Sequence, residues 1–186
     1  MILPIISYGH TGLREETQDI GPEYPDLEKL IEDMFETMYN AQGVGLAAPQ
    51  VNIPIRLFVV DASPLDPIGD EKLEDFKKVF INPEKLGEQG ESWPYEEGCL
   101  SIPDIREDVY RQEVVHMRYF DEHFNEHVET FTGMQARVVQ HEYDHLEATL
   151  FTDHLSGLRR RVLKARLNKI SKGQVPAPYP MRYPKK

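Results

Sequence analysis

The sequence predicts an α+β fold in which mainly antiparallel sheets wrap around a central helix. Three patterns predict it: an early amphipathic helix, a middle part rich in β-branched residues, and a return to helical spacing near residue 140. A chain of 186 residues is long enough for one domain with a sizeable core. We expect this single domain to span residues 1–172, and the Pro-rich basic tail 173–186 to be extended or disordered.

The expected elements follow in order along the chain. An N-terminal amphipathic helix from Pro25 to about Gln42 places apolar residues at helical spacing with acids opposite. Strands are expected at 55–61, 78–83, 109–121 and 127–133, while the polar, turn-rich segment 61–78 indicates a surface insertion. A buried helix at about 134–147 and a C-terminal basic helix at about 155–171 complete the domain.

Charge is divided unevenly along the chain. All 32 acidic residues precede residue 154, whereas 10 of the 21 Lys and Arg residues lie in 158–186. An acidic body repels nucleic acid, but a basic helix can contact a phosphate backbone at its own end of the molecule. A solvated helix that only balances the acidic body is an equally open interpretation.

The compartment is expected to be the cytoplasm. Cys99 is the only cysteine, so no intrachain disulfide can form, and MILPIISYGH lacks the basic and apolar regions of a secretory signal. No segment has the apolar length of a membrane span, so we expect no membrane partner.

The sequence HEYDH at residues 141–145 is the sharpest local signal. His141 and His145 lie four residues apart, so on a helix they share a face and can bind one metal ion. Glu142 is placed to take a proton from a water at that metal. The alternative is a pair of hydrogen-bonded core histidines on an ordinary helix.

A third ligand is needed, and Cys99 is the best candidate. The position six residues beyond the second histidine is Phe151, and no acid follows Asp153 that could serve as a downstream carboxylate ligand. A thiolate binds a borderline metal strongly, although a free cysteine is more often a small buried hydrophobe. Two His and one Cys leave a fourth position open, which is typical of a catalytic site.

The sequence GVGLAA at residues 43–48 has an alternative interpretation as a dinucleotide fingerprint. That fingerprint follows a strand and opens a helix, whereas here a helix comes first and prolines at 49 and 54 prevent another. We therefore expect no nucleotide cofactor and interpret the segment as a flexible loop with free N–H groups. Gln50, after it, is either an amide donor to a developing oxyanion or a solvated loop residue.

The blocks GVGLAAPQ, EEGCLS and QHEYDH, in this order, resemble the peptide deformylase family. The resemblance extends from the helix before Gly43 to the helix after Ser156. It implies a metal-dependent hydrolase that removes the N-formyl group from the N-terminal formylmethionine of newly made polypeptides and releases formate. The rivals are another amide hydrolase with the same site, and a non-catalytic ribosome-associated factor.

The resemblance also implies roles for individual residues. Cys99, His141 and His145 would bind one divalent metal, natively Fe(II), with Zn(II) or Ni(II) in purified protein. Catalytic roles fall to Glu142 as general base and acid, and to the Gln50 amide and the Leu100 N–H as oxyanion donors. Substrate binding falls to Val44, Gly45, Tyr95, Glu97, Met134 and Val138, and Arg106 would form a supporting ion pair with Glu97.

Two features depart from the family pattern, and one extends it. Ala148 stands where the family usually has glycine, which would cost on the order of 1 kcal/mol if the backbone there is left-handed. The insertion at 61–78 is more acidic and turn-rich than expected. The basic final helix resembles that of bacterial-type deformylases, which implies ribosome or rRNA contact.

Overall fold

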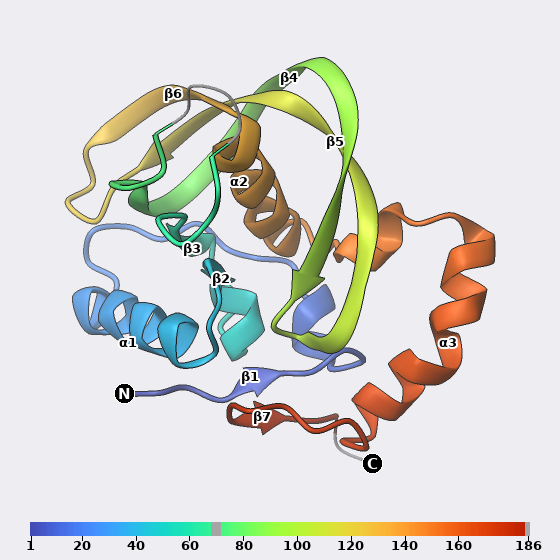
Figure 1. Ribbon diagram of the computed structural model, residues 1–186. Helices are drawn as coiled ribbons and strands as arrows, with labels where there is room; N and C mark the ends of the chain where they lie inside the picture. The colour runs from blue at the N-terminus through green and yellow to red at the C-terminus, as the bar shows by residue number, and fades with distance from the viewer. Residues whose placement is uncertain (68–71, 185–186) are drawn as a thin grey trace.

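The structure, a computed structural model, describes residues 1–67 and 72–184. A five-stranded antiparallel sheet in the order β2-β3-β4-β5-β6 curls around helix α2, while α1 and α3 lie outside it (Figure 1). The predicted α+β fold is therefore confirmed. The helices are α1 (Leu27–Asn40), α2 (Gly133–Leu146) and α3 (Gly157–Ser171), and the strands of this sheet are β2 (Gly45–Ala47), β3 (Leu57–Asp61), β4 (Lys77–Cys99), β5 (Ile102–Phe120) and β6 (Glu126–Thr132).

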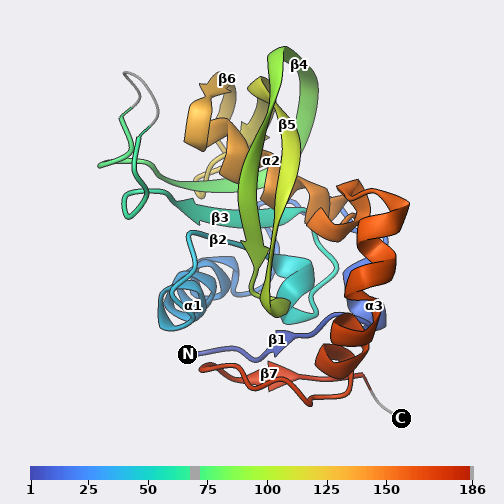
Figure 2. The ribbon, with the colours of Figure 1, turned by 45° about the vertical axis from the view of Figure 1, so that its right-hand side comes forward.

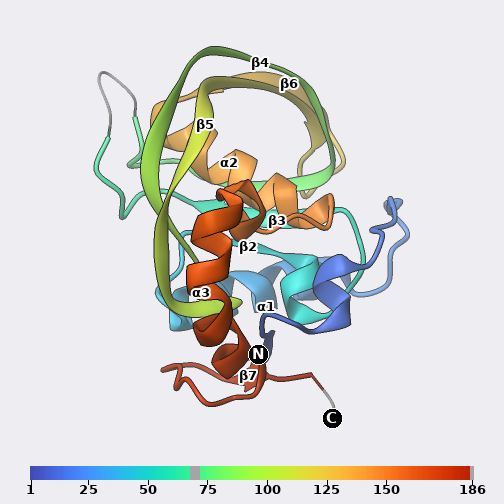
Figure 3. The same ribbon diagram turned by 90° about the vertical axis from the view of Figure 1, so that its right-hand side faces the viewer.

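The curl of the sheet comes from irregularities in the long β4–β5 pair. The register shifts four times along β4, between Ile81 and Glu84 and then at three further points before Cys99. Each bulge bends its strand and increases the local twist, so β4, β5 and β6 arch over α2 (Figure 3). The predicted strand at 78–83 is thus only the start of β4, because the glycines and prolines beyond it conceal a strand that bulges accommodate.

Helix α2 is the centre of the main core. Ala136, Val139 and Leu146 are buried against sheet residues that include Phe58 and Phe80. Helix α1 covers the other side of β2 and β3 through a second apolar cluster, as its amphipathic pattern predicts. Both predicted helix positions agree with the structure to within two residues.

The GVGLAA segment is a strand rather than a flexible loop over Gly45–Ala47. Gly45 pairs with Val60 and Ala47 with Phe58, so β2 forms an edge of the sheet. The prediction of a loop is wrong because glycine and alanine carry little strand propensity, whereas pairing with β3 supplies the backbone hydrogen bonds. The dinucleotide interpretation is not supported, because no helix of the fingerprint type follows β2 directly.

The C-terminal tail is extended within its described part, 173–184. Strand β7 (Met181–Arg182) pairs in parallel with β1 (Ile5–Ile6) to form a second, two-stranded sheet. Figure 2 shows this pair beneath the lower end of the β4–β5 hairpin. Residues 185–186 lie outside the described residues.

The insertion at 61–78 is anchored in the core at both ends. Ala62, Leu73 and Phe76 are buried, and the Phe76 ring meets Phe131 edge-on at a centroid distance of 5.6 Å. The prediction of a purely surface segment is therefore wrong for these residues, while residues 68–71 lie outside the described part.

The chain after α2 adopts the left-handed backbone that the family glycine would suit. Ala148 has φ 52°, and its neighbour Thr149 donates its N–H to the carbonyl of Asp144 at 2.8 Å. Ala148 therefore carries the predicted steric cost of a left-handed alanine.

Within the described ranges, no helix is both long and apolar enough to cross a membrane.

Candidate active site

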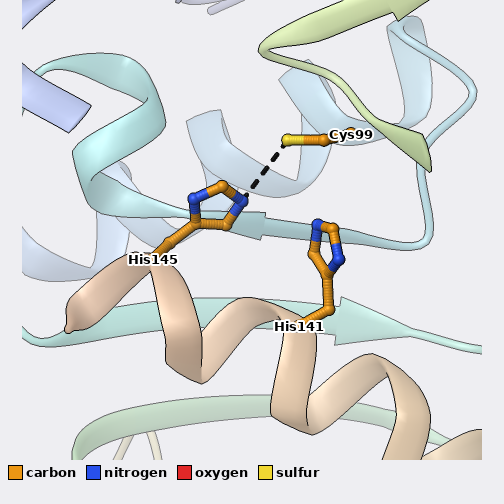
Figure 4. Close-up of side chains that lie close together, drawn as sticks. All are labelled: Cys99, His141 and His145. Atoms are coloured by element: carbon orange, nitrogen blue, oxygen red, sulfur yellow. Dashed lines mark hydrogen bonds between the residues drawn. The ribbon is translucent and has the colours of Figure 1, made fainter. Parts of the chain in front are cut away.

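The three predicted ligands come together at one point between the β4–β5 turn and α2. The nearest ligand atoms of Cys99, His141 and His145 all lie within 4.8 Å of one another. Cys99 Sγ is 3.4 Å from His145 Nε2, and the two imidazoles project from successive turns of α2 towards the thiol (Figure 4). The two histidines thus share a face of α2 because they are four residues apart, and the end of β4 supplies Cys99 as the third ligand.

Glu97 orients one of these histidines. Its carboxylate accepts hydrogen bonds from Arg111 Nε at 2.7 Å, Arg137 Nη1 at 3.0 Å and His141 Nδ1 at 2.9 Å. Burial raises the pKa of Glu97, but the hydrogen bonds from His141 and Arg111 outweigh it and hold that pKa well below its usual range. Because Glu97 is ionised, it keeps a proton on Nδ1 of His141, so Nε2 is the nitrogen through which His141 can bind a metal.

The expected ion pair between Glu97 and Arg106 is wrong. Arg106 instead donates to Glu96, with Nε at 2.9 Å from the carboxylate, and its side chain is 59% exposed. Successive residues of a strand point to opposite faces, so Glu96 and Arg106 share the outer face while Glu97 and Arg111 share the inner one. Arg106 still lies over the metal loop, the segment 98–100 that carries Cys99. Its Nη1 would be 3.1 Å from a Cβ at Gly98.

Glu142 is a buried carboxyl group beside the three ligands. Burial raises the pKa of Glu142 to about 7, and its Oε2 has no hydrogen-bond partner in residues 1–67 and 72–184. Its side chain packs against Gly45, where a Cβ would lie 2.3 Å from Oε1. Only glycine fits at position 45 without displacing this carboxyl, which links the GVGLAA block to the helix.

Gln50 is fixed rather than solvated. It lies in the short helix Ala48–Val51 and is 1% exposed. Its Oε1 accepts from the Ala47 N–H at 2.9 Å, and its Nε2 lies 3.4 Å from Cys99 Sγ. Nε2 also donates to Ser101 Oγ at 3.3 Å. The amide therefore presents a donor at the ligand cluster, in a fixed orientation.

Burial also sets the charge of the ligands. It lowers the pKa of His145 to about 3, so this imidazole is neutral, the form that binds a metal. Burial likewise lowers the pKa of His141, but hydrogen bonds to Cys99 and Glu97 outweigh it, and the net shift is upward. His141 must lose that extra proton when a metal binds, so metal binding releases protons.

A cleft of about 860 Å³ opens over the cluster. All six residues expected to bind substrate line it: Val44, Gly45, Tyr95, Glu97, Met134 and Val138. The carboxylate of Glu97, however, is occupied by its three hydrogen-bond partners. Gln50, Leu100 and Arg106 line it as well. Its walls combine apolar side chains with polar and charged groups, as a site for a small ligand or a peptide end requires.

The donor set fits a metal ion. One thiol and two imidazoles are ligands that Zn(II) and other borderline divalent metals prefer, and their convergence leaves a side open to the cleft. The unpartnered oxygen of Glu142 beside them needs a polar partner such as water. Core packing alone explains neither feature.

Comparison with known proteins decides the family. Residues 2–161 match the family model described as polypeptide deformylase. The chain belongs to this family. Curated peptide deformylases of Christiangramia forsetii and Cytophaga hutchinsonii are 52% and 54% identical to it, covering 99% of this chain and 97% and 98% of their own. The crystal structure of a peptide deformylase from Legionella pneumophila superimposes with a TM-score of 0.79 at 36% identity, covering 94% of this chain and 98% of that one.

The chain is thus an enzyme of the deformylase type, which removes the N-formyl group from nascent peptides. Family membership implies a metal ion, and the cluster of Cys99, His141 and His145 is available to hold it. The resemblance inferred from the three sequence blocks is confirmed.

Sequence reasoning missed several residues of the site. Arg111 and Arg137 hold Glu97, and Asp144 in turn accepts from Arg111 at 2.8 Å. Strand alternation was a usable signal for Arg111, since it shares its parity with buried Val109. The cleft is also lined by Leu65 of the insertion and by four tail residues, for which local pattern offered no signal: Val175, Pro176, Pro178 and Tyr179.

Proposed function

We propose that this deformylase is a metal-dependent hydrolase that cleaves the formyl amide of N-formylmethionyl peptides and releases formate. The observation that carries the proposal is the convergence of three ligand atoms within 4.8 Å beside a buried carboxyl group, at the floor of the cleft. Cys99, His141 and His145 would hold the metal. When bound, the metal acts as a Lewis acid towards water and the formyl oxygen.

Glu142 is the group that moves protons. Its ionised carboxylate takes a proton from the attacking water, whose oxygen adds to the formyl carbon. As the carbon–nitrogen bond breaks, Glu142 passes that proton to the leaving amine, so formate and a free N-terminus result. A carboxyl pKa near neutrality suits both transfers, because the group must be a base in one step and an acid in the next.

Gln50 and Leu100 stabilise the oxyanion that develops on the formyl oxygen. The buried Gln50 amide is held by the Ala47 N–H, so its donor end needs little reorganisation. The Leu100 N–H has no acceptor among the described residues, which leaves it available to the substrate.

The methionine side chain is proposed to lie among Val44, Tyr95, Met134 and Val138, with Glu97 supporting His141 beneath them and Gly45 of β2 contacting the peptide backbone. The unbranched thioether of methionine suits an apolar pocket with a flexible residue such as Met134. All of these residues border the same cleft. Arg106, at the cleft edge, is proposed to support the metal loop through Gly98 and Glu96, not through Glu97.

The native metal is proposed to be Fe(II), with Zn(II) or Ni(II) replacing it during purification. A thiolate ligand favours these metals over Mg(II) or Ca(II), and Fe(II) beside a thiolate is readily oxidised. Activity of the iron form is therefore expected to disappear in air, while zinc and nickel forms keep theirs. Metal analysis before and after air exposure, with formate release from the same samples, tests this.

The central test measures formate release from formyl-Met-Ala-Ser, with protein prepared without oxygen and metal quantified in the same sample. Release from this peptide but no hydrolysis of acetyl-Met-Ala-Ser is expected, and equal hydrolysis of both would favour a general amide hydrolase. Glu142→Ala is expected to keep the metal but lose turnover, whereas Cys99→Ala should lose the metal. Full activity of either variant would refute the assignment.

We further propose that α3 contacts ribosomal RNA near nascent chains in the cytoplasm. Arg159 and Arg166 form ion pairs with Glu107 and Asp104, which fasten the helix to β5. Arg160, Arg161 and Lys164 are exposed on α3 and form no ion pair with described residues. Ion pairing with the acidic body therefore accounts for Arg159 and Arg166. The three unpaired cations remain available for phosphates.

Ribosome cosedimentation at increasing KCl tests this partner. The Arg160→Ala/Arg161→Ala variant is expected to bind more weakly and to reduce the slope of log affinity against log salt by about one for each phosphate that it no longer binds. Its formate release from a short peptide should stay unchanged. Lys29→Ala on α1 is the control, and equal weakening by that variant would refute a role for α3.

A further inference from the structure

The C-terminal tail, residues 173–184, lies beside the proposed reaction site. Most of α3 and all of this tail lie beyond residues 2–161, so the match to the family assigns them no role. Val175, Pro176, Pro178 and Tyr179 nevertheless line the cleft together with Cys99 and Glu142. The tail therefore contributes a wall to a cleft whose chemistry comes from other elements.

The tail is held firmly in this place. The Ile5 N–H donates to the carbonyl of Pro180 at 3.0 Å, and the Ser7 N–H donates to that of Arg182 at 2.9 Å. These two hydrogen bonds join β1 to β7. Prolines at 176, 178 and 180 fix φ, which reduces the conformational freedom that the tail loses on docking.

The terminal segments also hold the turn that bears Leu100. Leu100 and Ser101 are the two residues between the paired Cys99 and Ile102. The Tyr179 hydroxyl donates to the carbonyl of Leu100 at 2.9 Å, and the Tyr8 N–H donates to that of Ser101 at 2.8 Å. Both carbonyls of the turn are thus fixed from the side of β1 and the tail.

The backbone N–H of Leu100, unlike its carbonyl, remains available to the substrate. The Leu100 N–H is used by no described acceptor, whereas the carbonyl of the same residue is bound by Tyr179. The Leu100 side chain packs against Gly43, where a Cβ would approach Cδ1 to 2.7 Å. With side chain and carbonyl both restrained, the rotation of the neighbouring peptide planes is limited.

We infer that Tyr179 is a positioning residue that aims the Leu100 N–H at the formyl oxygen by holding the Leu100 carbonyl. The inference rests on the proposed role of Leu100 as an oxyanion donor. An oxyanion donor must be fixed before the charge develops, because reorganisation during the reaction lessens its benefit. Loss of the Tyr179 hydroxyl therefore affects the transition state more than substrate binding.

Tyr179→Phe tests the inference, with Tyr183→Phe as the matched control in the same tail, since the Tyr183 hydroxyl makes no hydrogen bond with the described residues. Steady-state kinetics with formyl-Met-Ala-Ser, metal content and thermal melting are measured for both variants. Deletion of an oxyanion donor costs about 10²–10³ in kcat, so misalignment of a donor that remains should cost less, about 3- to 10-fold. KM, metal content and melting temperature should stay close to those of the wild type.

The outcomes separate the inference from the proposed function. Wild-type protein that holds metal but releases no formate overturns both. Wild-type turnover with an unchanged kcat in Tyr179→Phe overturns only the positioning role. The positioning role is likewise overturned if Tyr183→Phe loses as much, or if Tyr179→Phe loses metal or raises KM in proportion, because those results indicate general support of the cleft.

Discussion

Glu97→Gln tests the buried network beneath the proposed metal site. The substitution keeps the shape of the side chain but removes the charge that faces Arg111 and Arg137, both nearly inaccessible to solvent. It also places an amide donor among groups that donate: Arg111, Arg137 and Nδ1 of His141. The variant therefore leaves buried Arg137 without its counter-charge and leaves Arg111 with Asp144 as its remaining acidic partner among the described residues.

The expected cost follows from this geometry. Breaking a buried ion pair by removing one partner destabilises a protein by about 3–5 kcal/mol. For a chain of this size, each kcal/mol lowers the melting temperature by about 2–4 °C, so a fall of roughly 6–20 °C is expected. Metal affinity should also drop by about 10- to 100-fold, because His141 loses the partner that fixes its tautomer.

Glu96→Gln is the control, since Glu96 is the exposed neighbour that pairs with Arg106. An exposed pair is worth about 0–1 kcal/mol, so this variant should melt within a few degrees of the wild type. Urea denaturation of metal-free protein isolates stability from metal binding, and chelator competition measures the affinity. Equal destabilisation by the two variants would refute the buried network.

Three further predictions concern proton binding and the backbone. Because the folded-state pKa of Glu97 is depressed, its contribution to stability is present above the unfolded value near 4.5 and is lost as pH falls further. The stability difference between wild type and Glu97→Gln should then be constant from pH 7 to about 5 and shrink below, as denaturation at several pH values checks. For Glu142, with a pKa of about 7 before metal binding, the cation favours the carboxylate, so kcat/KM should fall along an acidic limb that lies below pH 7. A rate that rises with acidity would contradict its role as base. Ala148→Gly should raise the free energy of unfolding by about 0.5–1 kcal/mol by relieving the positive φ, whereas Ala165→Gly, exposed within α3, should lower it by about 1 kcal/mol.

The central residues of the site were predictable because their signals are local. His141, Glu142 and His145 follow from the period of one helix, and Cys99 stands out as the only thiol in the chain. The structure brings the two histidines together on one face, as their spacing predicts, and places Cys99 beside them. The helix itself was equally predictable, since helical spacing returns near residue 140 after the β-rich middle of the chain.

The partners of Glu97 were not predicted, because they depend on which face of a curled strand each side chain occupies. Arg106 is closer to Glu97 in sequence than Arg111, yet alternation sends Arg106 to the outer face. Arg111 lies opposite Trp93, four residues before Glu97 on the same face of the ladder, and its long side chain reaches back to Glu97. A family resemblance predicts which residue types occupy which positions, whereas strand register and sheet curvature determine which side chains are in contact.

For the tail, composition alone left two states open, extended or disordered. Proline-rich, polar sequence is typical of disorder because it buries little apolar surface, and a two-residue strand such as β7 has no period to detect. However, the same prolines lower the entropy cost of docking, and Tyr179 and Val175 each pack against an apolar cluster. Strand β1 supplies hydrogen bonds from the opposite end of the chain, a partner that no local window can reveal. Order in the tail is therefore a consequence of the finished fold, and if Tyr179 positions Leu100, the tail completes the oxyanion site.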